Sequence, residues 1–417
     1  MNKMYIEMPK DVEEIINKLT KAGFEAFAVG GCVRDTLLMR SPGDWDVTTS
    51  ALPEQVKEIF PKTIDTGIQH GTVTVMKNKT GYEVTTYRID GEYEDSRHPK
   101  SVEFTRNLTE DLKRRDFTIN AMAYNHEAGI VDEFNGIEDL ENRIIRCVGN
   151  PVHRFEEDAL RMMRAVRFSA QLDFVIEQET FDAIVRLSET IAKVSKERIQ
   201  TELSKILVSN HPDYLMRLCD GGIMAVILPE VDEVLKSNKG KVVLRAMAEA
   251  ENILAVRYGI LLSSVGEEKA IQILKKLRLD NHTVNTASKI VRYADTDVKP
   301  FETDVRKAMH EMGKEIFSLV YKAKTALVKA KEKELGIPML GRLNDINKVC
   351  RMYDTIIKRG DCIDIRDLAL KGTDLIEHGI QPGAHMGEIL DRLLMIVLEK
   401  PDVNNKEELI AIVENEL

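Results

Sequence analysis

The stretch that decides the fold is FAVGGCVRD at residues 27–35, followed closely by DWD at residues 44–46. An apolar run that ends in Gly30-Gly31 predicts a buried strand, a tight turn and the start of a helix. A second short segment then carries two carboxylates, Asp44 and Asp46, two positions apart. Side chains two apart on a strand point to the same face, so the pattern predicts that these carboxylates lie side by side.

These residue types fit a site for a metal ion and a phosphate group. Two adjacent like charges repel unless a cation lies between them, and Mg²⁺ takes one or two carboxylates together with substrate phosphates. Paired glycines let the backbone approach a bulky anion, and N–H groups at the following helix start point toward it. Taken singly, Gly-Gly is most often a tight turn and Asp-x-Asp a solvated strand end. Their order along the chain predicts a nucleoside triphosphate site.

The composition indicates a cytoplasmic protein of several domains. At 417 residues the chain is long enough for two to four domains, and its 6% aromatic content with abundant Leu, Lys and Glu favours helix. No run of residues is apolar enough for a membrane span, and residues 1–7 lack a signal core. The five cysteines are scattered without a Cys-x-x-Cys pair, which argues against disulfides and a zinc site. The net charge of −10 argues against nonspecific wrapping of nucleic acid, but local basic patches could still bind RNA.

Hydrophobic periodicity divides the chain into a mixed head and a helical remainder. We expect helices over 10–22, 32–39 and 54–60, a strand over 27–29, and strands over 72–76 and 82–88 joined by a turn at 78–81. Residues 90–100 are charged and aperiodic, which fits a surface loop or a lid beside an active site equally well. Beyond residue 150 helical periodicity prevails, and it ends in a strong helix over 388–398.

A pair of arginines, Arg114 and Arg115, precedes the apolar run at 117–123. Adjacent guanidinium groups beside a triphosphate site would neutralise and orient phosphate oxygens. The alternative is an ion pair with Glu110 or Asp111.

A third cluster lies in EEDALRMMRAVRF at residues 156–168, for which we predict one continuous helix. Its charged residues recur at steps of three and form a slanting ridge, while the residues between them are apolar nearly all the way round. The ridge consists of Asp158, Arg161, Arg164 and Arg167. Arginines on a packed helix are costly unless they are paired or face anions. The alternative is a set of surface salt bridges with Glu156 and Glu157, each worth little.

The first two residues of this ridge have a chemistry that can select bases. Cytosine and adenine both present an amino donor beside a ring-nitrogen acceptor, so Asp158 can accept from the first and Arg161 can donate to the second. Guanine and uracil present the opposite order, and the unpaired polar groups that result make rejection strong. The pair therefore predicts selection of C and A without a nucleic-acid template.

Four motifs in order resemble the class II tRNA nucleotidyltransferase/poly(A) polymerase family: GGCVRD (30–35), DWD (44–46), RRDFTINAMA (114–123) and EDALR (157–161). KGTDLI (371–376) and PGAHMGEIL (382–390) look like the tail of bacterial CCA-adding enzymes, so the resemblance covers essentially the whole chain. It implies an α+β fold with a polymerase-β-like nucleotidyltransferase head, a mixed sheet with helices, at 1–145. An all-helical neck (146–210), body (211–295) and tRNA-binding tail (296–417) would follow.

The resemblance also implies a role for each motif. The implied Mg²⁺ ligands and catalytic carboxylates are Asp44 and Asp46. The implied contacts to the nucleotide's sugar and triphosphate are Gly31, Arg34 and Arg115. The base would be read by Asp158 and Arg161, with Arg164 and Arg167 supporting the pocket. Glu83 is a candidate third carboxylate, although a solvated strand residue is the more ordinary interpretation.

The implied activity is template-independent addition of C, C and A to the tRNA 3′ end from CTP and ATP, with release of pyrophosphate. The alternatives are an enzyme that adds only the terminal A, a poly(A) polymerase, and a noncatalytic tRNA-binding protein on the same scaffold. The loop at 90–99 resembles the family's flexible loop, which is associated with the switch from C to A addition, so an enzyme limited to C is not expected.

The helical remainder gives three further expectations. No His-Asp dipeptide follows the neck, so phosphohydrolase activity is not expected, and the acidic end after Asn404 favours a tRNA enzyme over a poly(A) polymerase. Lys322, Lys329 and Lys333 lie on one predicted helical face that fits RNA phosphates or plain solvent. The sequence does not determine the oligomeric state, and a homodimer is possible.

Overall fold

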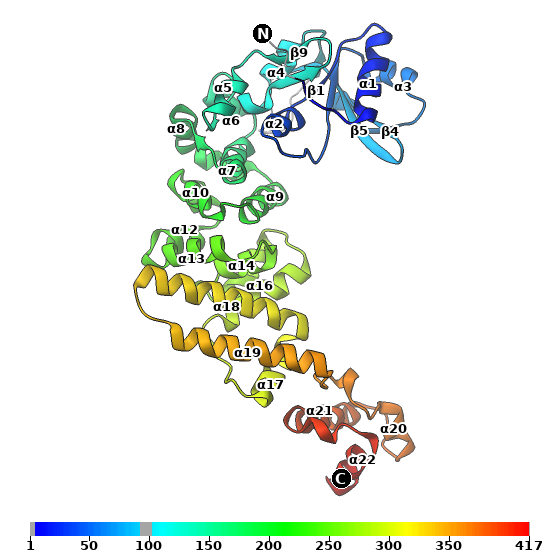
Figure 1. Ribbon diagram of the computed structural model, residues 1–417, viewed down its shortest axis with the longest axis vertical. Coiled ribbons are helices and arrows are strands. Elements are labelled where there is room, and N and C mark those ends of the chain that lie inside the picture. The colour runs from blue at the N-terminus through cyan, green and yellow to red at the C-terminus, as the bar shows by residue number, and fades with distance from the viewer. Residues whose placement is uncertain (1–4, 92–101, 417) are drawn as a thin grey trace. The chain divides into compact units, whose positions relative to one another are not determined.

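The computed structural model describes residues 5–91 and 102–416 and divides into two compact units, Met1–Pro229 and Glu230–Leu417. The first unit contains a mixed sheet followed by helices, and the described part of the second is helical throughout (Figure 1). The predicted α+β fold, a mixed head before a helical remainder, is therefore confirmed. No helix in the described ranges has the length and apolar character that crossing a membrane requires. Most of the expected loop at 90–100 lies outside the described residues.

A seven-stranded sheet forms the head, in the order β3-β4-β5-β2-β1-β8-β9. Within this sheet β2 and β5 run parallel, and the other neighbouring strands run antiparallel. The strands are β1 (Ala26–Val29), β2 (Val47–Thr49), β3 (Thr63–Gly67), β4 (Thr72–Lys77), β5 (Thr80–Thr86), β8 (Met122–Asn125) and β9 (Gly129–Asp132). Two small sheets pair β6 (Arg88–Asp90) with β7 (Val102–Phe104), and β10 (Ile144–Ile145) with β11 (Val175–Ile176).

The predicted elements of the head are confirmed, with small shifts at their ends. The helices are α1 (Lys10–Lys21), α2 (Gly31–Leu37), α3 (Pro53–Ile59), α4 (Leu108–Lys113) and α5 (Gly136–Glu141), with 3-10 turns at Ile68–His70 and Thr118–Asn120. The hairpin between β4 and β5 turns on two residues, Asn78 and Lys79, both at positive φ. Such mirror-image turns match the twist of the strands they join.

The core of the head explains why its strands are apolar. Both β1 and β2 lie in the middle of the sheet and are buried over their whole length. The aromatic rings of Phe27 and Tyr87 pack with Leu112 of α4 and with β8 in one hydrophobic cluster. Because β2 carries two buried threonines, their hydroxyls need partners: Thr49 donates to the Glu25 carbonyl at 2.6 Å and Thr48 to Asp111 at 3.1 Å.

The rest of the first unit is a stack of helices that begins with the arginine-rich segment. They are α6 (Pro151–Glu157), α7 (Leu160–Leu172), α8 (Gln178–Leu187), α9 (Lys196–Leu207), α10 (Met216–Asp220) and α11 (Ile223–Ile227), with 3-10 turns at Ser188–Lys193 and Pro212–Leu215. As predicted, α7 is buried nearly all round, and it packs closely against α9.

The predicted continuous helix over 156–168 is wrong, because it is interrupted at Asp158. The backbone there is extended (φ −145°, ψ 102°), so α6 ends at Glu157 and α7 starts at Leu160. The Asp158 carboxylate accepts from the Leu160 N–H at 3.1 Å, which satisfies one of the N–H groups at the start of α7. This capping favours the break.

The second unit is built on long helices. They are α12 (Pro229–Lys236, which begins at the last residue of the first unit), α13 (Asn238–Glu249), α14 (Leu254–Leu261), α15 (Glu267–Lys276), α16 (Asn281–Tyr293), α17 (Glu302–Met312), α18 (Lys314–Leu335), α19 (Leu340–Arg359), α20 (Gly372–Glu377), α21 (Ala384–Glu399) and α22 (Lys406–Glu416), with 3-10 turns at Ile365–Asp367 and Pro401–Val403. The predicted final strong helix corresponds to α21.

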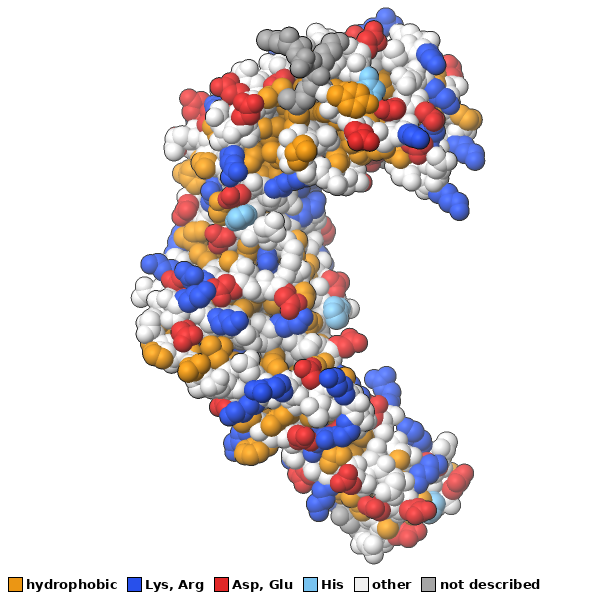
Figure 2. Space-filling model, viewed as in Figure 1, with side chains coloured by type: hydrophobic (Ala, Val, Ile, Leu, Met, Phe, Trp, Pro, Cys, Tyr) orange, Lys and Arg blue, Asp and Glu red, His pale blue; other side chains and the backbone are white. Residues whose placement is uncertain are grey.

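Close packing and mixed charge characterise this unit. Helices α14 and α16 pack so tightly that a Cβ on Gly259 would approach Ile290 to 2.6 Å. Helices α18 and α19 form a hairpin that reverses at the left-handed Gly336 (Figure 1). On the face drawn in Figure 2, Lys and Arg side chains stand among Asp and Glu rather than in one continuous basic surface.

Candidate active site

The Gly30-Gly31 turn places a backbone corner against Arg115. Gly30 has φ +80° and ψ −124°, a conformation that L side chains rarely adopt. A Cβ on Gly30 would lie 2.9 Å from Nη1 of Arg115, whereas one on Gly31 would meet only Nη2 of Arg34, at an ordinary 3.7 Å. The backbone conformation therefore favours glycine at position 30, and a Cβ there would also displace the flexible end of Arg115. No side chain caps the first turn of α2.

The two aspartates lie immediately before β2 rather than within it, which corrects the prediction that they share a strand. Asp46 nevertheless extends the pairing, because its carbonyl accepts from the Val29 N–H at 3.0 Å. Both side chains are open to solvent. The parallel register Val47↔Val84 brings the end of β2 beside Glu83 of β5.

The electrostatics of Asp46 indicate a place for a cation. Partial desolvation, together with the charges of Glu83 and Asp44, raises the pKa of Asp46, while Arg115 opposes the rise. Crowded carboxylates of this kind are relieved by a hard divalent ion with oxygen ligands. Among the described residues no three His, Cys, Asp or Glu side chains form a metal cage. The negative charge of Glu83 contributes to the raised pKa of Asp46.

Asp111 organises the arginine pair. This fully buried carboxylate accepts from Arg114 at 2.7 and 2.9 Å and forms a longer ion pair with Arg115 at 3.5 Å. Burial would raise the pKa of Asp111, but Arg114 and Arg115 hold that pKa below its usual range. The ion-pair alternative considered for these arginines is thus present. Arg115 is the less committed of the two, since its Nε has no hydrogen-bond partner within the described ranges.

A chain of hydrogen bonds joins α2 to α7. Arg34 donates to Asn120 at 2.6 Å, and Asn120 donates to Asp116 at 3.0 Å. Arg164 then donates twice to the other oxygen of Asp116, at 2.8 and 2.5 Å. Burial would raise the pKa of Asp116, but the Arg164 charge and the Asn120 hydrogen bond hold it well below its usual range. The chain therefore fixes Arg164, the third residue of the ridge, relative to the glycine turn.

Three guanidinium groups surround the ring of Phe168. The centres of Arg34, Arg164 and Arg167 lie 5.0, 5.4 and 4.1 Å from its centroid, within cation–π range. Arg167 is buried and pairs with Glu202 of α9 at 3.0 Å. Desolvation, partly offset by Glu202, lowers the pKa of Arg167 to about 10, so this guanidinium stays charged at neutral pH.

Asp158 and Arg161, the two residues predicted to read the base, are held by different partners. Arg198 of α9 donates to both oxygens of Asp158, at 2.7 and 3.3 Å. Arg161 donates to Glu157 at 2.5 Å and to backbone carbonyls of residues 154 and 114 at 3.2 and 3.0 Å. The salt bridge considered with Glu157 is therefore present, and it orients Arg161.

Sequence reasoning missed the partners that position these groups. Asp111 was noted only as an alternative, and Arg198 and Glu202 were not noted at all. Their spacing of four on α9, with opposite charges on one face, was a usable signal. Nothing in the sequence indicated that this face meets the arginine ridge.

The comparisons with known families cover most of the chain. The family described as Poly A polymerase head domain matches residues 26–146. The family described as "Probable RNA and SrmB- binding site of polymerase A" matches residues 173–235, and the family described as "tRNA nucleotidyltransferase domain 2 putative" matches residues 254–413.

Curated relatives and solved structures extend over nearly the full length. The CCA-adding enzyme of Ligilactobacillus salivarius is 38% identical over 411 residues, which cover 95% of this chain and 94% of the relative. The CCA-adding enzyme of Listeria monocytogenes is 38% identical over 406 residues, 94% of each chain. The crystal structure of the Bacillus stearothermophilus CCA-adding enzyme in complex with CTP is 35% identical with a TM-score of 0.77, and each chain is covered to 98%. The Thermotoga maritima CCA-adding enzyme complexed with tRNA_CCA, at 20% identity and a TM-score of 0.61 over 99% of this chain and 100% of that one, shares the fold. Identity of this level and coverage places the chain in the CCA-adding enzyme family of nucleotidyltransferases.

Proposed function

We propose that this protein is a CCA-adding tRNA nucleotidyltransferase, which adds C, C and A to the 3′ end of tRNA from CTP and ATP in the cytoplasm. The observation that carries the proposal is the convergence at the Gly30 turn, where Asp46 is crowded by carboxylates and lies in the field of Arg115. The CTP bound to the Bacillus stearothermophilus relative supports it. The five unpaired cysteines support a reducing compartment.

The proposed division of labour keeps the boundaries expected from the sequence. Residues 1–145 form the nucleotidyltransferase head and residues 146–210 the neck with the base-reading segment. Residues 211–295 and 296–417 form the body and the tail, which bind the tRNA.

In the proposed reaction the 3′ hydroxyl of the tRNA attacks the α-phosphate of CTP or ATP, and pyrophosphate leaves. Enzymes of this family generally use a divalent metal, and we propose Mg²⁺ held by Asp44 and Asp46, whose oxygen donors and mutual repulsion fit a hard cation. When bound, the ion would supply charge stabilisation at the reacting phosphate. Arg34 and Arg115 orient and neutralise the triphosphate, with Gly31 giving its backbone room to approach.

Nucleotide selection is proposed for the neck. Asp158 has three donors from the protein, namely the Leu160 N–H and two from Arg198, and retains lone pairs for the amino group of C or A. Arg161 donates to the adjacent ring nitrogen. Arg164 and Arg167 support this segment through Asp116 and Glu202.

The direct test is incubation of the full-length protein with tRNA that lacks its CCA end, together with Mg²⁺, CTP and ATP. The expected product is three nucleotides longer. CTP alone should extend the same tRNA by two residues; no product with CTP alone would identify an enzyme that adds only A. Asp44→Ala should abolish extension while tRNA binding persists, and no extension by the wild-type protein would refute the proposal.

A further inference from the structure

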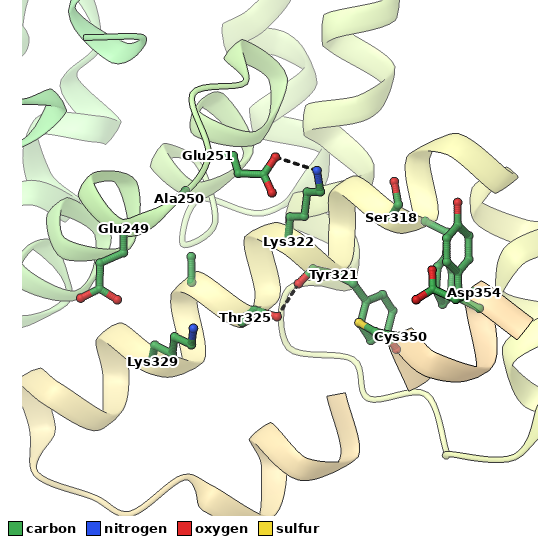
Figure 3. Close-up of a pocket in the computed structure, with 13 residues that line it drawn as sticks. Glu249, Ala250, Glu251, Ser318, Tyr321, Lys322, Thr325, Lys329, Cys350 and Asp354 are labelled. Carbon is green, nitrogen blue, oxygen red and sulfur yellow. Dashed lines mark hydrogen bonds and ion pairs between the residues drawn. The ribbon is translucent and has the colours of Figure 1, made fainter. Parts of the chain in front are cut away.

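The helical second unit contains a cavity whose lining includes none of the residues of the candidate active site. It has a volume of about 350 Å³, within the usual range for small-molecule sites. The segment after α13 and the helices α18 and α19 enclose it (Figure 3). Its lining comprises Glu249, Ala250, Glu251, Phe317, Ser318, Tyr321, Lys322, Thr325, Ala326, Lys329, Cys350, Tyr353 and Asp354.

Aromatic rings form one end of the cavity. The Phe317 ring stacks on Tyr321 with 4.6 Å between centroids and a 22° interplanar angle, and on Tyr353 with 5.3 Å and 11°. Phe317 and Tyr321 are buried, while Tyr353 is half-exposed. Ser318 and Asp354 lie at this end in Figure 3. Because Phe317 and Tyr321 are buried in this stack, half-exposed Tyr353 is the ring that can offer a planar heterocycle a π-surface, and the neighbouring Asp354 can accept from an amino group.

Some charged side chains around the cavity form ion pairs, and others do not. Glu251 accepts from Lys322 at 2.6 Å, and Glu249 pairs with Lys333 at 2.8 Å. Lys329 and Asp354 are exposed, and neither has an ion-pair partner within residues 5–91 and 102–416. One uncommitted cation and one uncommitted anion therefore face the same cavity.

The spacing of these groups matches a nucleotide. Tyr321 and Lys329 are eight residues apart on α18, or roughly 12 Å along the helix axis. That length accommodates a base at the aromatic end, a sugar, and a phosphate within reach of a long lysine side chain. Asp354 would repel an isolated phosphate group at the aromatic end, whereas Glu249 and Glu251, on the Lys322 and Lys329 side in Figure 3, are each paired with a lysine. The chemistry therefore favours a base at the aromatic end.

We infer that this cavity binds one unpaired nucleotide, with its base on the Tyr353 ring, its amino group on Asp354 and its phosphate on Lys329. The choice of a nucleotide over other planar amines rests on the proposed function, since a tRNA enzyme meets both RNA and free nucleoside triphosphates. The ligand has two sources, an unstacked nucleotide of the bound RNA or free CTP or ATP.

The test uses full-length variants at the exposed, uncommitted positions, where folding should be unaffected. These are Lys329→Gln and Asp354→Asn, with Tyr353→Leu added to remove a ring. The matched control is Lys331→Gln, because Lys331 lies on the same helix but pairs with Asp295 at 2.9 Å outside this cavity. We would measure tRNA affinity by filter binding at several salt concentrations, and the number of CTP and ATP molecules bound per chain by equilibrium dialysis.

An RNA ligand predicts a dissociation constant for tRNA raised roughly 5- to 100-fold by Tyr353→Leu, which is the usual effect of losing one base stack. Lys329→Gln should reduce the salt slope of tRNA binding by about 0.7 to 0.9, the loss of one phosphate contact. A free-nucleotide ligand predicts that the wild type binds one more nucleotide per chain than the Lys329 and Asp354 variants do, with tRNA affinity unchanged.

Wild-type affinity, salt slope and nucleotide stoichiometry in all three variants would overturn the inference. Altered binding in the variants of a protein that fails to extend tRNA would support the cavity and refute the proposed function. Normal extension of tRNA, together with unaltered tRNA and nucleotide binding in all three variants, would support the proposed function and refute the cavity as a nucleotide site. The two ideas therefore fail separately.

Discussion

Substitution of Gly30 by alanine tests whether the glycine turn positions Arg115. The turn holds φ at +80°, and non-glycine residues in such conformations cost on the order of 1–3 kcal/mol. The new methyl group would also lie 2.9 Å from Nη1 of Arg115, closer than real contacts allow. Overpacking of this kind costs about 1–3 kcal/mol, and the flexible end of the arginine absorbs part of it. We therefore expect Gly30→Ala to destabilise the head by about 2–4 kcal/mol.

The chain contains a reporter and a matched control for this measurement. Trp45 is the single tryptophan and stands between the two aspartates of the site, so its emission follows unfolding of the head in urea. With a urea dependence of about 2 kcal/mol per molar, in the middle of the usual range, the midpoint should fall by roughly 1–2 M. Gly31→Ala adds the same methyl group one residue later, at an ordinary 3.7 Å from Arg34 and without positive φ. Its stability should be unchanged or raised by up to about 1 kcal/mol.

Activity provides the second readout for the same pair of variants. Because Gly30→Ala displaces the Arg115 guanidinium, the KM for CTP should rise while affinity for tRNA is retained. Equal midpoints for Gly30→Ala and Gly31→Ala, or an unchanged midpoint in the first, would refute the argument from backbone conformation and space.

Three further predictions concern the carboxylates of the first unit and their partners. Asp46→Asn should lower kcat for CTP addition by at least roughly 100-fold with unchanged tRNA affinity, measured by primer extension and filter binding. Arg198→Met should reduce discrimination between CTP and UTP by roughly 10-fold, because Asp158 loses two orienting donors; a purely structural role would lower kcat/KM for both nucleotides equally. Asp116→Asn removes the charge that pairs with the partly exposed Arg164 and should cost about 1–3 kcal/mol at pH 7, measured by urea unfolding. Because the folded pKa of Asp116 is depressed, this stabilisation is fully present above the unfolded value of about 3.9 and should be lost as the pH falls below it.

Local sequence signals predicted the frame of the head well. The buried run at Phe27 and the glycines after it specify a central strand and a sharp turn, because burial and positive φ each restrict the residue type strongly. The same holds for the hairpin at Asn78 and Lys79, whose conformation only a few residues tolerate. Such features depend on neighbours in sequence, which a single chain displays.

The partners of the charged residues could not be predicted in the same way. The contact between Arg34 and Asn120 spans 86 residues, and that between Arg198 and Asp158 spans 40. The sequence pattern of a charged residue on a helix face is the same whether its side chain contacts solvent or a buried carboxylate. Only the fold decides that Asp111 and Asp116 are buried and that the arginines near them are therefore held in place.

The break at Asp158 changes how selectivity must be understood. On a continuous helix, the direction of Asp158 would follow from helical periodicity, and its geometry relative to Arg161 would be that of two residues one turn apart. In the observed structure the backbone leaves the helix at Asp158, so helical periodicity no longer sets the direction of the Asp158 side chain.

The direction of the Asp158 side chain is set instead by Arg198 of α9 and by the start of α7. The direction of the Arg161 side chain is set by Glu157 at the end of α6. The two groups that we propose to read the base are thus anchored to separate helices, and a change in the packing of α9 against α7 alters the distance between the donor and the acceptor. Discrimination between C and U should consequently be more sensitive to substitutions on α9 than the rate of phosphoryl transfer is, since no hydrogen bond or ion pair among the described residues joins Asp44, Asp46 or Glu83 to that helix.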